Sequence, residues 1–348
     1  MASWDAIIIG AGIAGLSVGA VLSARGYKVR VVDPAYPYQD AASSMSAGIV
    51  VSSIHEVLAP LVKETIAVFK EYGLVLSKGA LYIYPDKWCA ARSRKAVEAG
   101  GFDWSTVDHD EARSLVGSSI VLGDDEVTAL VEEYVVDAGS FLTRLHSKIL
   151  ENGGTITKST IDNASGGIII VAAGPWTPRI ITEIRDKTIV YRCQAQALTD
   201  PLSDITIEDE SLGYYLARHP GESIIGDGSN TILDNADSGF KPDVEDSYRV
   251  LELAAARLPE AAYTGFKRVW SAPCIVGLDG LPLVGHVRED IYVMTGFNGA
   301  GITLAWGAAV LLADAIEGVR RLPHEFDPTR EIDEAPDRDK PREPYDLC

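Results

Sequence analysis

A glycine triplet near the start of the chain constrains the fold more than any other feature. The apolar run 6–9 is followed by Gly10, Gly12 and Gly15, the spacing G-x-G-x-x-G, and a second apolar run covers residues 29–32. In this pattern the first glycine permits a tight turn, the second lets a pyrophosphate approach the backbone, and the third lets a helix pack closely on a strand. The sequence therefore predicts a strand, a helix and a second strand that together bind a dinucleotide.

The residues around the triplet indicate how the nucleotide is held. A helix that begins near Ile13 and ends at Gly26 directs its free N–H groups and the positive end of its dipole at the phosphates. Asp33 closes the second strand, where a carboxylate suits both ribose hydroxyls and repels a 2′-phosphate. The position of the motif at the start of the sequence favours FAD over NAD. The predicted nucleotide contacts in this unit are Gly10, Gly12, Ile13, Ala14, Gly15, Asp33 and Pro34.

Composition argues against several classes of protein. The chain has 348 residues, which fits two domains or one domain with a large insertion. A formal net charge of −19 argues against non-specific binding to nucleic acid or to an anionic membrane. The four cysteines form neither a CxxC pair nor a disulfide ladder, which favours a reducing, cytoplasmic setting. Glycines interrupt the apolar stretches 6–24 and 296–316, so we expect no membrane span, and the histidines lack the spacing of metal ligands.

Three later stretches extend the pattern. The small and hydroxyl-bearing residues of 43–48 suit a backbone that passes close to a flat ligand, although an ordinary flexible loop explains them equally well. Residues 166–180 read as a buried strand that ends in a tight turn, and the segment 134–156 before it contains a helix. Residues 279–318 contain an Asp-Gly-x-Pro turn, two strands, a glycine-rich turn and a long helix. All three stretches are compatible with a second set of nucleotide contacts.

Together, residues 5–50, 134–180 and 268–318 resemble the D-amino-acid oxidase, glycine oxidase and sarcosine oxidase family of FAD-dependent amine oxidoreductases. The resemblance implies FAD as the cofactor. It also implies an α/β fold with two domains, a Rossmann-like FAD-binding domain and an interleaved antiparallel-sheet substrate domain. The expected FAD-binding domain comprises 1–50, 134–185 and 269–322, the substrate domain 51–133 and 186–268, and an extended, charged C-terminal tail 323–348.

The resemblance also implies further FAD contacts. In the family, the turn equivalent to 296–303 lies over the flavin pyrimidine, where its N–H groups and the start of the helix stabilise negative charge. Residues 43–49 would flank the phosphates and the flavin ring, and residues 173–176 would lie along the nucleotide. The contacts implied are Ser43, Ser44, Met45, Ala47, Gly48, Ile49, Ala173, Gly174, Trp176, Gly296, Asn298, Gly299, Ala300, Gly301, Ile302 and Thr303.

The remaining segments lack nucleotide motifs. Aromatic and β-branched content predicts strands at 79–85, 189–198, 212–220 and 223–228, and apolar periodicity predicts helices at 54–72, 91–100 and 244–257. An amine oxidoreductase needs a cation to hold a substrate carboxylate and a polar or aromatic cage to orient the substrate. The catalytic candidates are Arg218, Tyr215 or its neighbour Tyr214, and His55. Ordinary strand positions explain Tyr215 and Arg218 equally well, and His55 also suits the start of a helix.

Cys274 stands at a position where relatives differ. Counting from Trp270 places it where glycine-oxidase-like members carry an arginine that pairs with the substrate carboxylate, which argues against simple oxidation of glycine or D-amino acids. Monomeric sarcosine oxidases carry a flavin-linked cysteine in roughly this strand. Three roles stay open for Cys274: a buried structural thiol, a thiol that contacts or links the flavin, and a nucleophile.

The predicted function is FAD-dependent oxidation of an amino acid or secondary amine, in which hydride leaves the substrate α carbon for flavin N5 and an imine forms. One alternative on the same fold is an FAD-dependent 2-hydroxy-acid or glycerol-phosphate-type dehydrogenase. Another is an accessory flavin subunit of a dye-linked dehydrogenase complex, which the missing arginine and the acidic tail favour. The expected partner is a small-molecule amine or amino acid, with a homo-oligomer or a heteromeric complex compatible with the sequence.

Overall fold

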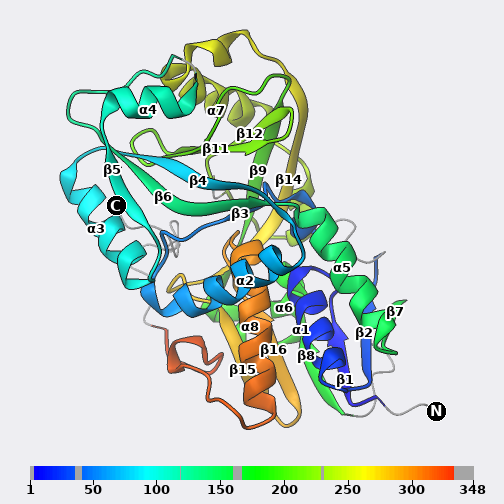
Figure 1. Ribbon diagram of the computed structural model, residues 1–348. Coiled ribbons are helices and arrows are strands. Elements are labelled where there is room, and N and C mark those ends of the chain that lie inside the picture. The colour runs from blue at the N-terminus through cyan, green and yellow to red at the C-terminus, as the bar shows by residue number, and fades with distance from the viewer. Residues whose placement is uncertain (1–3, 36–40, 118, 160–166, 229–230, 333–348) are drawn as a thin grey trace.

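The computed structural model describes residues 4–35, 41–117, 119–159, 167–228 and 231–332. These residues form two β-sheets, one above the other in Figure 1, with helices packed on both. The predicted α/β class with two sheets is confirmed. In the part of the chain that the structure describes, no helix is long and apolar enough to cross a membrane.

The lower sheet has six strands in the order β15-β16-β8-β1-β2-β7. All neighbouring strands run parallel except β15 and β16, which run antiparallel. Helix α1 packs against α5 and α8 beside this sheet (Figure 1). The bounds are β1 (Ala6–Ile9), α1 (Ile13–Ala24), β2 (Val29–Asp33), α5 (Ala138–Glu151), β7 (Thr155–Lys158), β8 (Ile168–Val171), β15 (Leu283–Arg288), β16 (Ile291–Thr295) and α8 (Gly301–Ile316). The predicted strand, helix and strand at residues 6–33 are thus confirmed.

The upper sheet has ten strands in the order β13-β9-β12-β11-β10-β4-β6-β3, with β14 paired to β9 and β5 paired to β6. It is antiparallel except for β10 and β4, which run parallel. Every strand predicted for the substrate half is present. The bounds are β3 (Ile49–Val50), β4 (Val75–Tyr84), β5 (Trp104–Val107), β6 (Val127–Val136), β9 (Thr188–Leu198), β10 (Thr206–Asp209), β11 (Tyr214–His219), β12 (Glu222–Gly226), β13 (Thr231–Ile232) and β14 (Phe266–Gly277).

The predicted helices of the substrate half are also present, and a side chain caps the start of α3 and of α7. The carboxylate of Asp86 accepts from two N–H groups at the start of α3, and Asp243 does the same for α7. The helix bounds are α2 (Ala59–Glu71), α3 (Lys87–Ala99), α4 (His109–Val116), α6 (Thr177–Ile180) and α7 (Val244–Arg257). Short 3₁₀ turns are η1 (Ala42–Met45), η2 (Glu56–Leu58), η3 (Gly174–Trp176), η4 (Thr182–Lys187), η5 (Ala236–Phe240), η6 (Pro259–Tyr263) and η7 (His324–Phe326).

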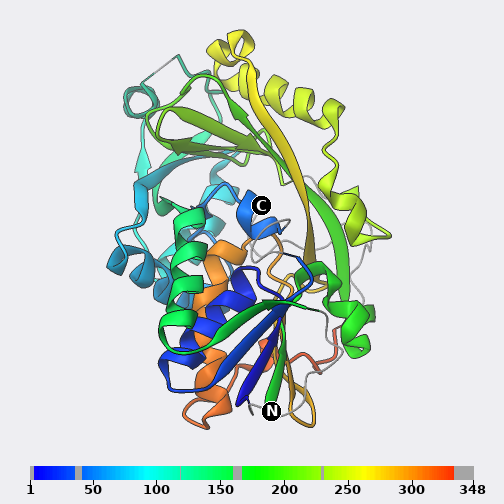
Figure 2. The same cartoon turned by 90° about the vertical axis from the view of Figure 1, so that its right-hand side faces the viewer.

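Two long strands connect the sheets. Figure 2 shows β9 and β14 descending together from the upper sheet toward the lower one. Near its end, β14 meets the loop between β16 and α8: Val276 forms a bridge with Phe297, and the Asn298 N–H donates to the Ile275 carbonyl at 3.0 Å. The chain order therefore brings the glycine-rich loop of the lower sheet against a strand of the upper sheet.

The charged segment at 323–332 packs on the fold, in contrast to the extended arm expected there. Phe326 is buried, and the Arg330 guanidinium forms an ion pair with Asp279 at 2.8 Å. Lys187 donates to the carbonyl oxygens of Pro328 and Arg330 at 3.1 and 2.7 Å. The rest of the predicted tail, 333–348, lies outside the described residues.

Candidate active site

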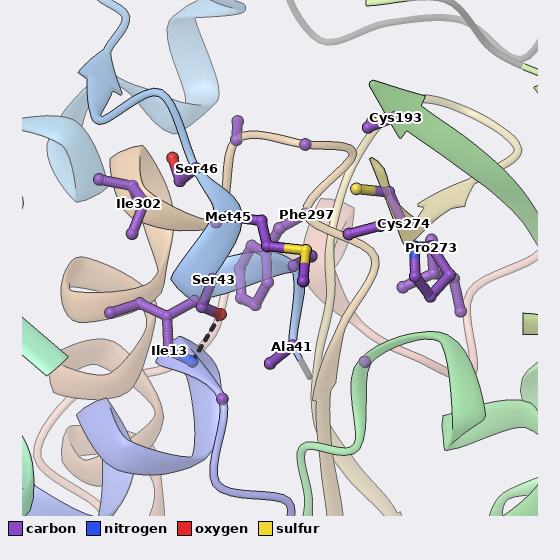
Figure 3. Close-up of a pocket in the computed structure, with 18 of the residues that line it drawn as sticks. Ile13, Ala41, Ser43, Met45, Ser46, Cys193, Pro273, Cys274, Phe297 and Ile302 are labelled. Atoms are coloured by element: carbon purple, nitrogen blue, oxygen red, sulfur yellow. Dashed lines mark hydrogen bonds between the residues drawn. The ribbon is translucent and has the colours of Figure 1, made fainter. Parts of the chain in front are cut away.

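A cavity of about 1190 Å³ lies between the two sheets. Its lining comes from the loops after β1, β2, β8 and β16, from η1, and from the upper-sheet strands β4, β9, β10, β11 and β14. Figure 3 shows part of this lining, including Met45, Phe297, Cys193 and Cys274. The cavity is large enough for a dinucleotide and a small substrate, since ligand pockets usually measure about 300–1,000 Å³.

The three glycines of the N-terminal motif have different structural roles. Gly10 has a φ of +105°, and a Cβ there would lie 2.4 Å from the Ala172 carbonyl oxygen. A Cβ on Gly15 would lie 1.9 Å from the Gly10 carbonyl oxygen, so the surrounding backbone leaves no room for a side chain at this position. Gly12 differs, because the nearest atom to an added Cβ is Ser43 Oγ at 3.4 Å. Gly10 and Gly15 are thus required for packing, whereas Gly12 leaves its space open to the cavity.

Two side chains hold the glycine loop against the cavity. The Asp33 carboxylate accepts from the Ala11 N–H at 2.7 Å and from the Ala35 N–H at 2.8 Å. Ser43 Oγ accepts from the Ile13 N–H at 2.9 Å, the bond drawn in Figure 3. The first turn of α1 contains no acidic residue. The start of the helix therefore keeps the positive character that binds phosphate.

The loop between β16 and α8 presents a polar group to the cavity. Asn298 has a φ of +47°, and its side-chain oxygen accepts from the Tyr191 hydroxyl at 2.5 Å. Its amide nitrogen is buried and has no hydrogen-bond partner among the described residues. A buried donor without a partner is costly in a folded protein, which indicates that a ligand acceptor meets it. This orphaned donor, the open space at Gly12 and the helix start fit the flavin and phosphate ends of FAD.

One row of residues crosses the upper sheet above the loops. Strand pairing places Glu208 directly between Tyr82 on β4 and Tyr215 on β11. The row continues from Tyr215 through Gly226 and Ala195 to Trp270. Directly opposed residues share a face of a sheet. Tyr82, Glu208, Tyr215, Ala195 and Trp270 all line the cavity.

Gly226, the glycine in this row, leaves room for the ring of Tyr215. A Cβ on Gly226 would lie 2.4 Å from the Tyr215 hydroxyl, so the ring lies across the space that a side chain would fill. Burial raises the pKa of Tyr215, and Cys193 and Glu208 raise it further. At the end of the row, Trp270 Nε1 donates to the Met45 carbonyl at 2.6 Å. The row is thereby connected to the loop that follows the N-terminal unit.

Glu208 contacts a second buried carboxyl group. Glu133 on β6 is 1% exposed, accepts from the Tyr82 hydroxyl at 2.7 Å, and forms a pair with Glu208. Burial raises the pKa of Glu133 to about 7. Burial, followed by the charge of Glu133, raises the pKa of Glu208 well above its usual range. The two carboxyl groups therefore hold a proton at neutral pH.

On β10, the residue after Glu208 is a buried acid that pairs with a positively charged side chain. Asp209 follows Glu208 but pairs with the Arg257 guanidinium at 2.6 Å, and Arg257 also pairs with Glu126 at 2.7 Å. Arg257 and other bonds outweigh partial burial and lower the pKa of Glu126 to about 2. Arg257 compensates Asp209 and Glu126, whereas Glu208 and Glu133 have no ion-pair partner among the described residues.

The side chains of Cys193 and Cys274 both belong to the cavity lining. Cys274 is 8% exposed and packs with Tyr191 and Val276. It lies opposite Tyr191 in the pairing of β14 with β9, one residue before Ile275, which accepts the bond from Asn298. The thiol is thus placed beside the loop assigned to the flavin ring.

Most of the predicted site residues line this one cavity. Those that do are Gly10, Gly12, Ile13, Ala14, Asp33, Pro34, Ser43, Met45, Ala47, Ile49, Ala173, Gly174, Trp176, Tyr215, Cys274, Gly296, Asn298, Gly299, Ala300, Gly301, Ile302 and Thr303. Three predicted contacts do not belong to the lining. Gly15 packs under Gly10, a Cβ on Gly48 would lie 2.4 Å from the Val136 carbonyl oxygen, and the Ser44 hydroxyl donates to the Ala41 carbonyl.

Two predicted catalytic residues lie outside the cavity. Alternate residues of a strand point to opposite faces, so Arg218 faces away from the side that Tyr215 occupies, and its N–H donates to Thr206 Oγ1 at 3.2 Å. His55 is exposed, and its Nδ1 accepts from the Val57 N–H at the start of η2. Arg218 does not line the cavity, so it is not placed to anchor a substrate there. His55 caps the 3₁₀ turn η2.

Sequence reasoning missed the acidic part of the site. Glu133, Glu208 and Tyr82 carry no motif, and their meeting depends on the pairing of three strands. One signal was available, because Glu132 and Glu133 interrupt an otherwise apolar strand in the segment VTALVEEYVV. A charged residue in a buried strand is uncommon and marks a position that requires explanation.

Comparison with known proteins gives a family match over most of the chain. Residues 5–315 match the model of the FAD dependent oxidoreductase family (DAO). The chain is 24% identical over 278 residues to the D-amino acid dehydrogenase of Granulibacter bethesdensis (strain ATCC BAA-1260 / CGDNIH1), an alignment that covers 74% of this chain and 60% of that protein. It is also 24% identical over 257 residues to the D-amino acid dehydrogenase of Rhizobium rhizogenes (strain K84 / ATCC BAA-868), covering 66% and 60%. The chain thus spans 60% of the length of these two curated relatives.

Solved structures share the whole fold. The L-proline dehydrogenase from P. horikoshii superposes with a TM-score of 0.82 at 20% identity, covering 94% of this chain and 97% of that one. The glycine oxidase from Geobacillus kaustophilus gives a TM-score of 0.81 at 20% identity, with coverage of 95% and 99%. The iminodiacetate oxidase from Chelativorans sp. BNC1 gives 0.78 at 18% identity, with coverage of 93% and 98%.

Proposed function

The chain belongs to the FAD dependent oxidoreductase family, and from this premise we propose that it oxidises the carbon–nitrogen bond of an amine or amino acid. FAD is the cofactor of the family. When bound, FAD supplies a two-electron acceptor to which a substrate C–H bond can deliver hydride. The nitrogen lone pair then forms the C=N bond, and water hydrolyses the resulting imine.

The residues of this chain would hold the cofactor along the cavity. Gly12 and the start of α1 would face the phosphates, and Asp33 would face the ribose. The Asn298 amide and the N–H groups at the start of α8 would stabilise negative charge at the pyrimidine end. Tyr215 and Trp270 close the opposite side, so the upper sheet orients the substrate and excludes water from it.

The observation that carries the proposal is the absence of histidine from the described cavity lining. Oxidation of a hydroxy acid requires a base to remove the hydroxyl proton while hydride leaves, and histidine is the side chain most often used for this at neutral pH. An amine that has given up its ammonium proton needs no further base, because its lone pair drives the step. The lining therefore favours an amine over the 2-hydroxy-acid or glycerol-phosphate alternative.

An anaerobic screen of flavin bleaching tests the proposal. The FAD-loaded protein is mixed with amines, N-methylamino acids, amino acids and 2-hydroxy acids, and the loss of flavin absorbance is followed. We expect bleaching by at least one amine or amino acid and none by hydroxy acids. Rapid bleaching by a hydroxy acid alone would support the alternative, and protein that takes up no FAD would exclude both.

A further inference from the structure

The charged side chains that line the cavity among the described residues are all acidic. No arginine, lysine or histidine belongs to its lining in the ranges that the structure describes. The acidic residues that line it are Asp33, Glu208, Asp209, Glu210, Asp227 and Asp237. An amino-acid substrate would therefore bring its carboxylate into an environment with no opposite charge to receive it.

Glu208 differs from Asp209, Asp227 and Asp237 because no positive side chain among the described residues compensates it. Asp209 has Arg257, Asp227 has Arg249, and Asp237 has Arg179 and the Trp176 N–H. The Asp33 carboxylate accepts from two backbone N–H groups. Neither Glu208 nor Glu133 forms an ion pair with any described arginine or lysine. Buried carboxylates are rarely left in this way unless a ligand completes the arrangement.

Glu133, which pairs with Glu208, also indicates a missing positive group. It is 1% exposed, and its Oε1 has no hydrogen-bond partner among the described residues, whereas its Oε2 accepts from Tyr82. The unpartnered oxygen belongs to the carboxyl group paired with Glu208, and Glu208 and Tyr82 both line the cavity. The pair is satisfied either by a shared proton or by a cation at the cavity surface of Glu208.

The neighbours of Glu208 suit an organic cation. Tyr82 and Tyr215 are its direct partners on the two adjacent strands, and both line the cavity. Aromatic rings attract ammonium groups through their negative faces, by about 0.5–1 kcal/mol at exposed sites and more where water is excluded. A carboxylate between two tyrosines is thus complementary to an alkylammonium group and repels an anion.

We propose that Glu208, supported by Glu133, binds the ammonium group of the substrate and accepts its proton to leave the neutral amine, and that the substrate is an amine without a carboxylate. The inference rests on the proposed amine oxidation and narrows its substrate class. Cys274, a thiol with no positive charge, lines the same cavity, in agreement with the absence of arginine and lysine from the described lining. The net charge of −19 further favours the approach of a cation.

Substrate pairs that differ only in the carboxylate test the inference. Pyrrolidine is compared with L- and D-proline, dimethylamine with sarcosine, and 1,5-diaminopentane with L- and D-lysine. We expect the second-order rate constant of anaerobic bleaching to be at least tenfold higher for the amine in the reactive pairs. Faster bleaching by the amino acids would overturn the inference while leaving amine oxidation in place.

Equilibrium binding gives a readout without turnover. Tetramethylammonium and acetate are titrated into the FAD-loaded protein, and the shift of the flavin spectrum is recorded. We expect tetramethylammonium to bind at least tenfold more tightly than acetate. This measurement remains decisive even if no amine is oxidised, so failure of the proposed function and failure of the inference are distinguishable.

Two matched variants test whether Glu208 is the group that binds the cation. Glu208→Gln removes the charge and keeps the shape, and should weaken tetramethylammonium binding at least tenfold while FAD content is retained. Glu222→Gln removes the same charge from β12 outside the cavity lining, where Lys267 and Arg268 pair with it, and should leave binding unchanged. Unchanged binding in Glu208→Gln would refute the assignment, and the wild-type substrate pairs test it even if that variant is unstable.

Discussion

Glu133 shows how one buried side chain makes stability depend on pH. Burial raises its pKa in the folded state to about 7, whereas a glutamate in the unfolded chain titrates near its ordinary value. The folded state therefore binds more protons between the two pKa values, and stability falls as pH rises through about 7. Below the unfolded pKa the contribution is fully present.

The variant Glu133→Gln should remove this dependence. Its free energy of unfolding, relative to wild type, should rise by roughly 2–3 kcal/mol between pH 5 and pH 8.5, because one pKa unit corresponds to about 1.4 kcal/mol. Urea unfolding at a series of pH values measures the difference. Glu222→Gln is the control, since its exposed ion pairs contribute little. Parallel pH profiles for wild type and Glu133→Gln would contradict the assignment.

Cys274 leads to a prediction about how FAD is attached. Covalent attachment through sulfur requires a reactive thiolate, and nearby positive charge normally stabilises one. The described cavity lining has no such charge, and Cys274 packs with Tyr191 and Val276. Acid precipitation of the purified protein should therefore leave the yellow colour in the supernatant. Cys274→Ala should retain FAD at the wild-type ratio, and colour in the pellet of wild type but not of the variant would show a covalent link.

At the level of the element, different glycines at the turn between β1 and α1 are required for folding and for cofactor binding. Gly15→Ala places a Cβ 1.9 Å from the Gly10 carbonyl oxygen, so we expect loss of soluble folded protein or a decrease in stability of several kcal/mol. Gly12→Ala meets only Ser43 Oγ at 3.4 Å, so the fold should persist. FAD affinity should then fall at least tenfold, because the methyl group occupies the space of the pyrophosphate.

Circular dichroism and FAD titration distinguish these two outcomes. Gly26→Ala controls for replacing glycine in the same unit; nothing lies within 4 Å of its Cβ, although its φ of +92° adds local strain. Normal FAD binding by Gly12→Ala would show that the second glycine does not approach the cofactor.

The same element explains what the sequence could predict. The strand, turn and helix at 6–24 follow from local rules, because glycine spacing and apolar runs act over a few residues. Arg218 and Tyr215 point to opposite faces of the sheet. Which of the two faces the cavity depends on strand register, which pairs Tyr215 of β11 with Glu208 of β10. Periodicity in one strand shows that its residues alternate, but not which face meets the cavity. The sequence therefore did not show that Arg218 lies outside the cavity lining or that Glu208 lies within it.

At the level of the whole molecule, segments far apart in sequence meet at one cavity. The N-terminal loop, the loop before α8 and the long strand β14 all contribute to its lining. The family resemblance supplied this arrangement for the cofactor, and the shared motifs made it predictable. The acidic face of the upper sheet carries no such motif. It depends on the pairing of β4, β6 and β10, which a single sequence does not specify.

Because both sheets line the cavity, FAD should stabilise the whole molecule and not only the lower sheet. At a free FAD concentration of 100 times its Kd, the gain is about 2.7 kcal/mol, which corresponds to a rise in Tm of several degrees. Hydrogen exchange should show protection in the loop 296–301 and also in the cavity-facing part of β14, Ala272–Ile275. Helix α4 lies outside the cavity lining and serves as the internal control. Protection confined to residues 10–15 and 296–301 would show that the upper sheet does not contact the cofactor, and the roles given to Tyr215 and Trp270 would then fail.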